Sequence, residues 1–213
     1  MIYATTNAHQ HIVQDPDPPS PRHRALTTAA ALGGLGGLAL FADLSVHAFG
    51  PLGRSYFILA TGLALSLLGV PIAYWLRGAI TTGWRRVLAV AGTGLVVLGA
   101  AAWIIAFVIL FNDPDAAFTQ RLTPAGSVLM ALGMLLLGTS VLASRQLSGL
   151  RKAAPLVVGV FFPAQLIIQL MFFLNGNDAA PGPNGALLGT WGLLWAWAAW
   201  ASVSTKNQDL NRP

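Results

Sequence analysis

The chain has no cysteine and no glutamate among its 213 residues. The absence of cysteine excludes disulfide bonds, thiolate nucleophiles and cysteine-ligated metals. Without glutamate, the seven acidic residues are all aspartates, so glutamate-dependent chemistry inside a membrane is excluded as well. No set of nucleophile, base and oxyanion donor can be assembled from the remaining residues. We therefore expect a protein that is not an enzyme and that carries no metal and no cofactor.

Charged residues are also scarce. They make up 9% of the chain, against roughly 25% in an average soluble domain. Apolar residues make up 55%, they occur in long blocks, and the mean hydropathy is +0.64. A soluble protein of this size cannot bury so much apolar surface with so few charges to cover it. The composition therefore predicts an integral membrane protein.

Six stretches almost free of charge are long enough to cross a membrane, because ~17–25 apolar residues span the hydrocarbon core as a helix. We expect an all-α fold in which residues 25–203 form one bundle of six transmembrane helices. Residues 1–24 are polar and rich in proline, which predicts a mobile cytoplasmic tail, and residues 204–213 predict a second cytoplasmic tail. The six predicted spans are residues 25–48, 55–76, 87–111, 124–143, 154–174 and 186–203.

Lysine and arginine are distributed unevenly between the two sides of this predicted bundle. Of the twelve basic residues, only Arg54 and Arg121 lie in loops on one side. Because basic residues accumulate in cytoplasmic loops, we place the other side, with both termini, in the cytoplasm of a cell membrane protein. An even number of spans independently requires both termini on one side. Since the basic residues are divided among span ends, we expect no binding to nucleic acid.

Small residues recur at regular spacing in two of the predicted spans. Such spacing lets another helix approach closely, so beyond the lipid bilayer we expect a second copy of the chain or other membrane subunits as partners. Pro71 and Pro163 each remove a backbone hydrogen bond and should bend the second and fifth spans. Thr123 and Pro124 predict the start of the fourth span. The small residues are Ala29, Gly33 and Gly37 in the first span and Gly126, Gly133 and Ser140 in the fourth.

Asp43 is the only fully charged side chain inside a predicted span. His47 follows one helical turn later, and helical spacing places both residues on the face that also carries Gly33 and Gly36. A carboxylate inside a membrane costs ~2.5–3.5 kcal/mol at the midplane and less near the interface. Asp43 therefore needs a partner, and His47 and Arg54 are the nearest in sequence. One interpretation is that this pairing only holds the first two helices together.

The same region also predicts a ligand or proton site. Spans one and five run from the inside to the outside, so Asp43, His47, Gln165 and Gln169 all come late in their spans and should lie in the outer third of the membrane. An Asp–His pair can bind a cation or transfer protons. Two hypotheses about function follow from the sequence. The first is a non-enzymatic scaffold or accessory protein, and the second is a small transporter or sensor whose outward-facing pocket is lined by these four residues.

Overall fold

The structure is a computed structural model that describes residues 20–47, 60–61, 64–78, 83–113, 116–144, 147–174 and 181–203. Within the helices, the side chains of residues 43–47, 120, 169–174 and 181–188 are outside the description. The described residues form helices joined by turns, and no strand occurs among them. The predicted all-α fold is thus confirmed for this part of the chain. The helices are α1 (Pro21–His47), α3 (Gly69–Leu76), α4 (Trp84–Asn112), α5 (Thr119–Leu142), the short 3-10 helix η1 (Gly149–Lys152), α6 (Ala154–Leu174) and α7 (Pro181–Val203).

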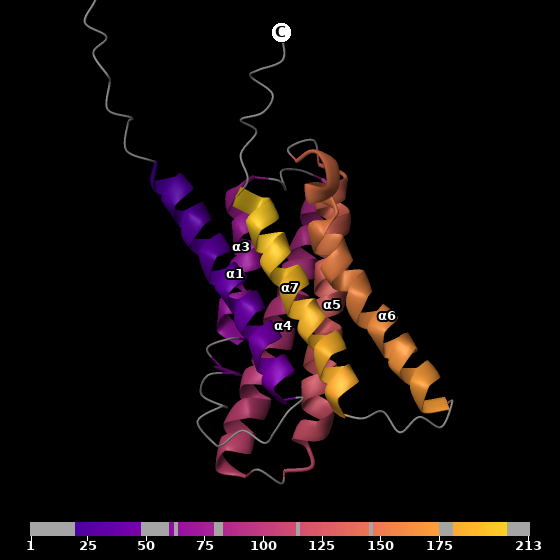
Figure 1. Ribbon diagram of the computed structural model, residues 1–213. Coiled ribbons are helices and arrows are strands. Elements are labelled where there is room, and N and C mark those ends of the chain that lie inside the picture. The colour runs from indigo at the N-terminus through magenta and orange to yellow at the C-terminus, as the bar shows by residue number, and fades with distance from the viewer. Residues whose placement is uncertain are drawn as a thin grey trace, which may run out of the picture.

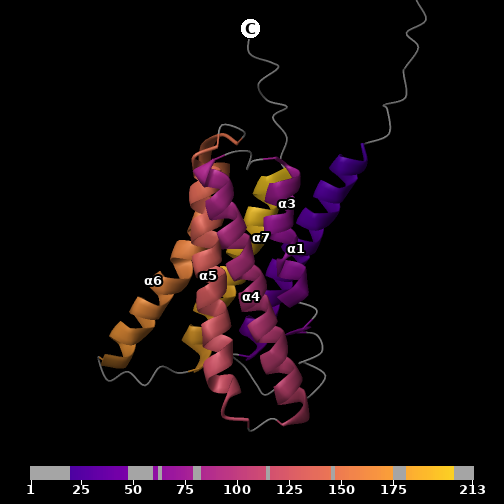
Figure 2. The ribbon, with the colours of Figure 1, turned by 180° about the vertical axis from the view of Figure 1, so that it is seen from behind.

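The helices pack as a bundle of two layers (Figures 1 and 2). In the view of Figure 1, α1, α7 and α6 lie in front of α3, α4 and α5. The most extensive contacts join α4 to α5 and α1 to α7, and α6 packs on both α5 and α7. The last helix, α7, thus lies in the middle of the front layer, although it comes last in the chain. The start of α1 and the end of α7 reach the same end of the bundle (Figure 1).

Three of these helices are long and apolar enough to cross a membrane: Pro21–Ala42, Trp84–Asn112 and Arg121–Leu142. The helical segments Ala64–Leu76 and Ala154–Ile168 are apolar but shorter within the described residues. Large aliphatic side chains cover the outside of the bundle, as expected where a surface meets lipid. The structure therefore supports a membrane protein. Exposed aliphatic side chains on the three long helices include Leu35 (64%), Val87 (68%) and Leu98 (58%).

Proline has different effects in two of the helices. Pro71 has no N–H for the carbonyl of Leu67, and the helix is interrupted by a turn at Leu68 before α3 begins. The prediction that Pro124 lies in the first turn of its helix is wrong, because α5 begins at Thr119 and Pro124 lies inside it. The first turn forms earlier because the Phe118 carbonyl accepts from two backbone N–H groups, at 3.1 and 3.2 Å.

Glycines set the distance between neighbouring helices. A Cβ atom added to Gly92 of α4 would lie 2.6 Å from the carbonyl oxygen of Gly133 in α5, and the reverse addition would give 2.5 Å. Gly37 of α1 and Gly192 of α7 are related in the same way, at 2.5 Å in both directions. Backbone atoms cannot yield as a flexible side chain can, so even a methyl group does not fit at these crossings. Other close approaches of this kind occur at Gly33, Gly69, Gly99, Gly126, Gly138 and Gly159.

We predict that Gly92→Ala lowers the stability of the bundle by about 1–3 kcal/mol, the usual cost of overpacking a well-packed interface. Gly94→Ala is the matched control, because it lies two residues away on the same helix and its added Cβ would meet nothing within 4 Å. That control should leave the unfolding temperature unchanged or slightly raised. Tryptophan fluorescence during thermal unfolding in detergent measures both variants. Equal unfolding temperatures for Gly92→Ala and the wild type would refute the role given to this crossing.

Candidate functional site around Gln165

Gln165 lies on the inner face of α6. Its side chain is 1% exposed, and neither its amide oxygen nor its amide nitrogen has a hydrogen-bond partner among the described residues. The buried residues Val158 and Phe162 precede it at intervals of four and three along the helix, so all three share one face. A primary amide with no partner in such surroundings is unusual, because buried polar side chains are normally hydrogen-bonded.

The other residues of the predicted outward pocket fall outside the described side chains. Asp43 and His47 lie within the bounds of α1, and Gln169 lies within α6, but their side chains are not described. Arg54 lies outside the described residues altogether. The hypothesis that these residues meet Gln165 in one pocket therefore stays a prediction.

The face of α1 that carries Gly33 and Gly36 points into the bundle as far as it is described. Gly33 and Gly36 are buried, and Leu40 is 2% exposed. Added Cβ atoms on Gly33 and Gly36 would collide with Val70 and Ser66, respectively. The inner face of α1 thus packs against α3 and the helical residues just before it.

Five of the described aromatic side chains form a cluster in the interior on the Phe162 side of Gln165. The Phe162 and Trp191 ring centroids lie 5.1 Å apart. Trp191 also meets Trp195 and Trp103 edge to face, with centroid distances of 5.9 and 6.1 Å. Phe107 completes the cluster by packing edge to face on Trp103 at 6.0 Å. Edge-to-face contacts of this kind are favourable beyond the area that they bury.

Sequence reasoning did not assign a site to this aromatic cluster. The signal was present, because Trp103 and Phe107 are four residues apart, as are Trp191 and Trp195. That spacing places each pair on one face of its helix. Nothing in the spacing says that the two faces meet, since the pairs belong to α4 and α7.

Most polar groups next to this cluster are satisfied by main-chain carbonyls. The Trp191 indole N–H donates to the carbonyl of Val158 at 2.9 Å, and the Trp103 indole N–H donates to the carbonyl of Thr123 at 3.0 Å. The carbonyl of Val158, which accepts this bond, is next to a missing backbone hydrogen bond in α6, because Pro163 has no N–H for the carbonyl of Gly159. The Trp195 indole N–H, by contrast, has no partner in the part of the chain that the structure describes. Unpartnered polar groups in this described interior are therefore exceptions.

The Gln165 amide is chemically able to hold a small polar molecule. It offers two N–H donors and a carbonyl acceptor, and leaving such a group unpaired in an apolar interior is unfavourable. A ligand or water that pairs with it would therefore gain more than at an exposed amide. Among the described residues, no group of three His, Cys, Asp or Glu side chains is placed to hold a metal ion.

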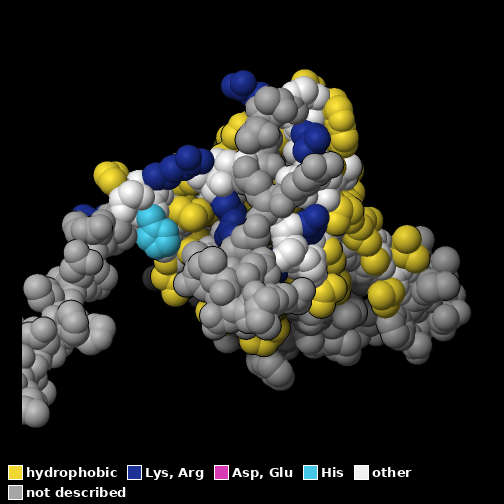
Figure 3. Space-filling model, turned by 90° about the horizontal axis from the view of Figure 1, so that it is seen from above, with side chains coloured by type: hydrophobic (Ala, Val, Ile, Leu, Met, Phe, Trp, Pro, Cys, Tyr) yellow, Lys and Arg dark blue, Asp and Glu magenta, His cyan; other side chains and the backbone are white. Residues whose placement is uncertain are grey.

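Lysine and arginine side chains gather at the end of the bundle where α1 begins and α7 ends (Figure 3). We call this the basic end. Positive charge at this end of the structure coincides with the side that the sequence places in the cytoplasm. The described basic residues of this end are Arg22, Arg24, Arg77, Arg85, Arg86, Arg151 and Lys152.

Two of these arginines cap the ends of helices to which they do not belong. Arg22 Nε donates to the carbonyl oxygen of Leu76, the last residue of α3, at 2.8 Å. Arg77 Nη1 donates to the carbonyl oxygen of Ser202 near the end of α7. The last carbonyls of a helix lack partners within it and attract positive charge. Burial lowers the pKa of the Arg77 guanidinium, and the nearby charge of Arg151 acts in the same direction.

Arg151 itself lies over the ring of Trp200, with its guanidinium carbon 5.5 Å from the ring centroid.

Comparison of the chain with protein-family models, curated proteins and solved structures finds no match. Fold alone does not determine function, and the described residues offer two features beyond the packing of the bundle, the buried amide of Gln165 and the basic end.

Proposed function

We propose that this chain is a six-span protein of the cell membrane that acts as a non-enzymatic scaffold or accessory subunit. The observation that supports this role is the position of one glycine. Gly92 and Gly99 of α4 are both used in close contact with α5, whereas an added Cβ on Gly94 would meet nothing within 4 Å. Gly94 is exposed on the outer face of α4, where a helix from another molecule can approach.

The proposed placement in the membrane follows from helix length and charge. At 1.5 Å per residue, α6 (21 residues) and α7 (23 residues) are about 32 and 35 Å long, which is enough to cross the ~30 Å hydrocarbon core. The basic end is placed in the cytoplasm by the positive-inside rule. Trp84 and Trp200, both 58% exposed at this end, have the position expected of interfacial tryptophans.

We predict opposite labelling of single cysteines placed at the two ends of the bundle. The chain contains no cysteine, so each variant carries one thiol only. Ala117→Cys, between α4 and α5, should react with a membrane-impermeant maleimide on intact cells. Ser148→Cys, just before η1, should react only after the membrane is permeabilised. Both positions are exposed, and the reverse pattern would overturn the orientation.

The outer face of α4 is proposed as the surface that contacts a partner. Val87, Val90, Leu98 and Ile105 are exposed on it, at 68%, 54%, 58% and 52%, and their spacing places them on the side of Gly94. A glycine flanked by aliphatic side chains lets a second helix come close enough for extensive van der Waals contact. The proposed partner is therefore a transmembrane helix, from a second copy or from another membrane subunit.

We expect Gly94→Leu to weaken this association by about tenfold, an effect of ~1.4 kcal/mol, without unfolding the bundle. Association of two differently labelled copies is measured by energy transfer in lipid vesicles, and association with other subunits by quantitative co-purification. Ala164→Leu, an exposed small-to-large change on α6, is the matched control. If both variants associate as the wild type does, the surface assigned to α4 is wrong.

A second function, a small transporter or sensor, is favoured by the unpartnered amide of Gln165. A bound ion or polar solute would complete its hydrogen bonds, and the predicted pocket residues Asp43, His47 and Gln169 would supply further ligands. In this proposal the outward-facing pocket is closed in the structure, because Gln165 is almost fully buried.

Gln165→Leu separates these two functions. Replacing an unsatisfied buried amide by an apolar side chain should raise the unfolding temperature of the ligand-free protein. If the residue binds a solute, at least one of a panel of monovalent salts, amino acids and sugars should stabilise the wild type and Phe162→Leu, but not Gln165→Leu. A panel with no effect on the wild type would leave Gln165 as a purely structural feature and remove the support for transport or sensing.

A further inference from the structure

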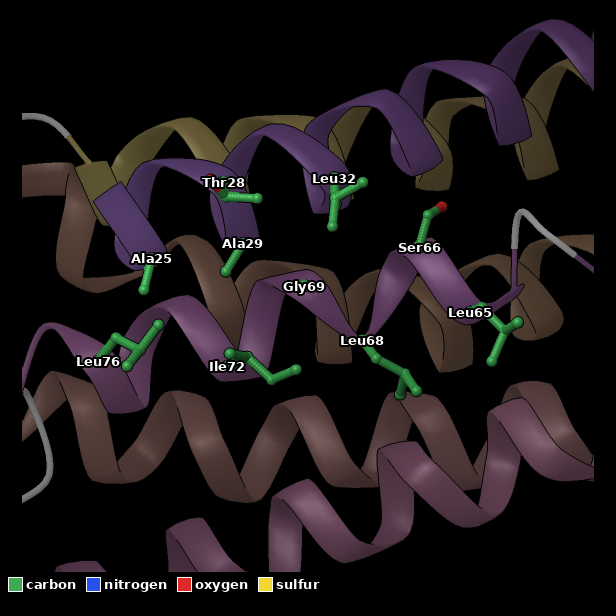
Figure 4. Close-up of a pocket in the computed structure, with 10 residues that line it drawn as sticks. All are labelled: Ala25, Thr28, Ala29, Leu32, Leu65, Ser66, Leu68, Gly69, Ile72 and Leu76. Carbon is green, nitrogen blue, oxygen red and sulfur yellow. The ribbon is translucent and has the colours of Figure 1, made fainter. Parts of the chain in front are cut away.

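A groove of about 510 Å³ runs between α1 and α3 (Figure 4). One wall extends along α1 from Ala25 to Leu32, and the other extends from Leu65 to Leu76. At 1.5 Å per residue, these walls are about 10 and 16 Å long. The groove is open on the outer surface of the bundle, because Leu32 and Leu65 are 50% and 53% exposed. Its walls are aliphatic apart from the hydroxyl groups of Thr28 and Ser66.

Small side chains create this groove. Gly69 approaches the carbonyl of Ala29 so closely that a Cβ would collide with it, which brings the two helices together along one line. Beside that line, Ala25 and Ala29 are too short to fill the space between the helices. The groove is therefore a fixed consequence of the crossing of α1 and α3.

Among the described residues, positive charge lies at only one end of the groove. Arg22 Nε donates at 2.8 Å to the carbonyl oxygen of Leu76, a residue that lines the groove, so the guanidinium lies at the basic end. This bond leaves the terminal N–H groups of the guanidinium for other acceptors. Arg24, two residues away, is exposed as well. Among the side chains that the structure describes, the only carboxylate is that of Asp113, at the opposite end of the bundle.

We propose that the groove binds one acyl chain of an anionic phospholipid, and that Arg22 binds its phosphate group. An aliphatic groove with a cation at one end is complementary to an amphiphile with an anionic head. The longer wall covers about half of the ~30 Å hydrocarbon core, which is the depth of one leaflet. Arginine suits the head group because its planar guanidinium binds phosphate through two donors. The inference rests on the proposed placement of the basic end at the cytoplasmic surface.

Lipid binding by the full chain tests this inference. The protein is purified in a neutral maltoside detergent and titrated with phosphatidylglycerol or phosphatidylcholine that carry identical acyl chains, and native mass spectrometry counts the bound lipids. One phosphatidylglycerol should bind more tightly than phosphatidylcholine. Arg22→Gln should weaken that binding about fivefold, the effect of one basic residue near anionic lipid. Arg86→Gln removes a charge from the same end of the bundle, away from the groove, and should leave the binding unchanged.

A second pair of variants tests the acyl chain. Ala25→Phe should fill the groove and abolish tight phosphatidylglycerol binding, whereas Ala31→Phe, at another exposed position of α1 that does not line the groove, should retain it. Equal weakening by Arg22→Gln and Arg86→Gln would show diffuse charge attraction and overturn the site. A change of oligomeric state in Ala25→Phe, without a change in lipid binding, would overturn it in favour of a second copy. Neither the lipid-binding measurement nor the oligomeric state of Ala25→Phe depends on Gly94. A failure of the lipid site can therefore be distinguished from a failure of the proposed scaffold role, which Gly94→Leu tests.

Discussion

The bundle depends on helices that touch through their backbones. In lipid, an apolar side chain gains little by moving from the acyl chains into a protein interior, so van der Waals contact at short interhelical distance carries much of the association. The crossings at Gly37 and Gly192 and at Gly92 and Gly133 provide that contact. Each crossing also fixes the rotation of both helices, because a shift by one residue turns a helix by about 100° and would place a side chain in the contact.

The rotation fixed by glycine determines where the large side chains lie. Gly192 faces α1. Trp191 precedes it by one residue and therefore points about 100° away from the direction of Gly192 around the axis of α7. There it meets Trp103 of α4 and Phe162 of α6. In this way α7 packs on one neighbour through glycine and on the others through tryptophan. The same rotation leaves Trp200 58% exposed, although it belongs to the same helix.

The helical fold and the use of small residues for packing could be predicted from sequence, because hydropathy and spacing are local properties. Which helix meets which face could not. Ala29, Gly33 and Gly37 form one small-residue series, yet Gly33 contacts α3 and Gly37 contacts α7. A helix face made of small residues allows any other helix with small residues to come close, so the spacing does not identify the partner. The helix start predicted at Thr123 and Pro124 is wrong, because α5 begins at Thr119 and the Phe118 carbonyl already accepts hydrogen bonds from its first turn. Gln165 could be singled out as a polar residue in an apolar run, but its complete burial could not be foreseen.

Gln165 differs from the buried tryptophans and tyrosine in the kind of partner that it needs, because its amide oxygen requires a donor. Trp103, Trp191 and Tyr74 are donors, and each finds a main-chain carbonyl, at 3.0, 2.9 and 3.1 Å. A helical interior supplies such acceptors readily, since carbonyl oxygens have a second lone pair and Pro163 leaves one without its helical donor. It supplies almost no donors, because the backbone N–H groups are consumed within the helices. The Gln165 oxygen therefore has to find its donor in another side chain or in a bound molecule. Its amide nitrogen and the Trp195 indole N–H also lack a partner among the described residues, so a free lone pair on a carbonyl satisfies a buried donor only where the geometry brings the two together.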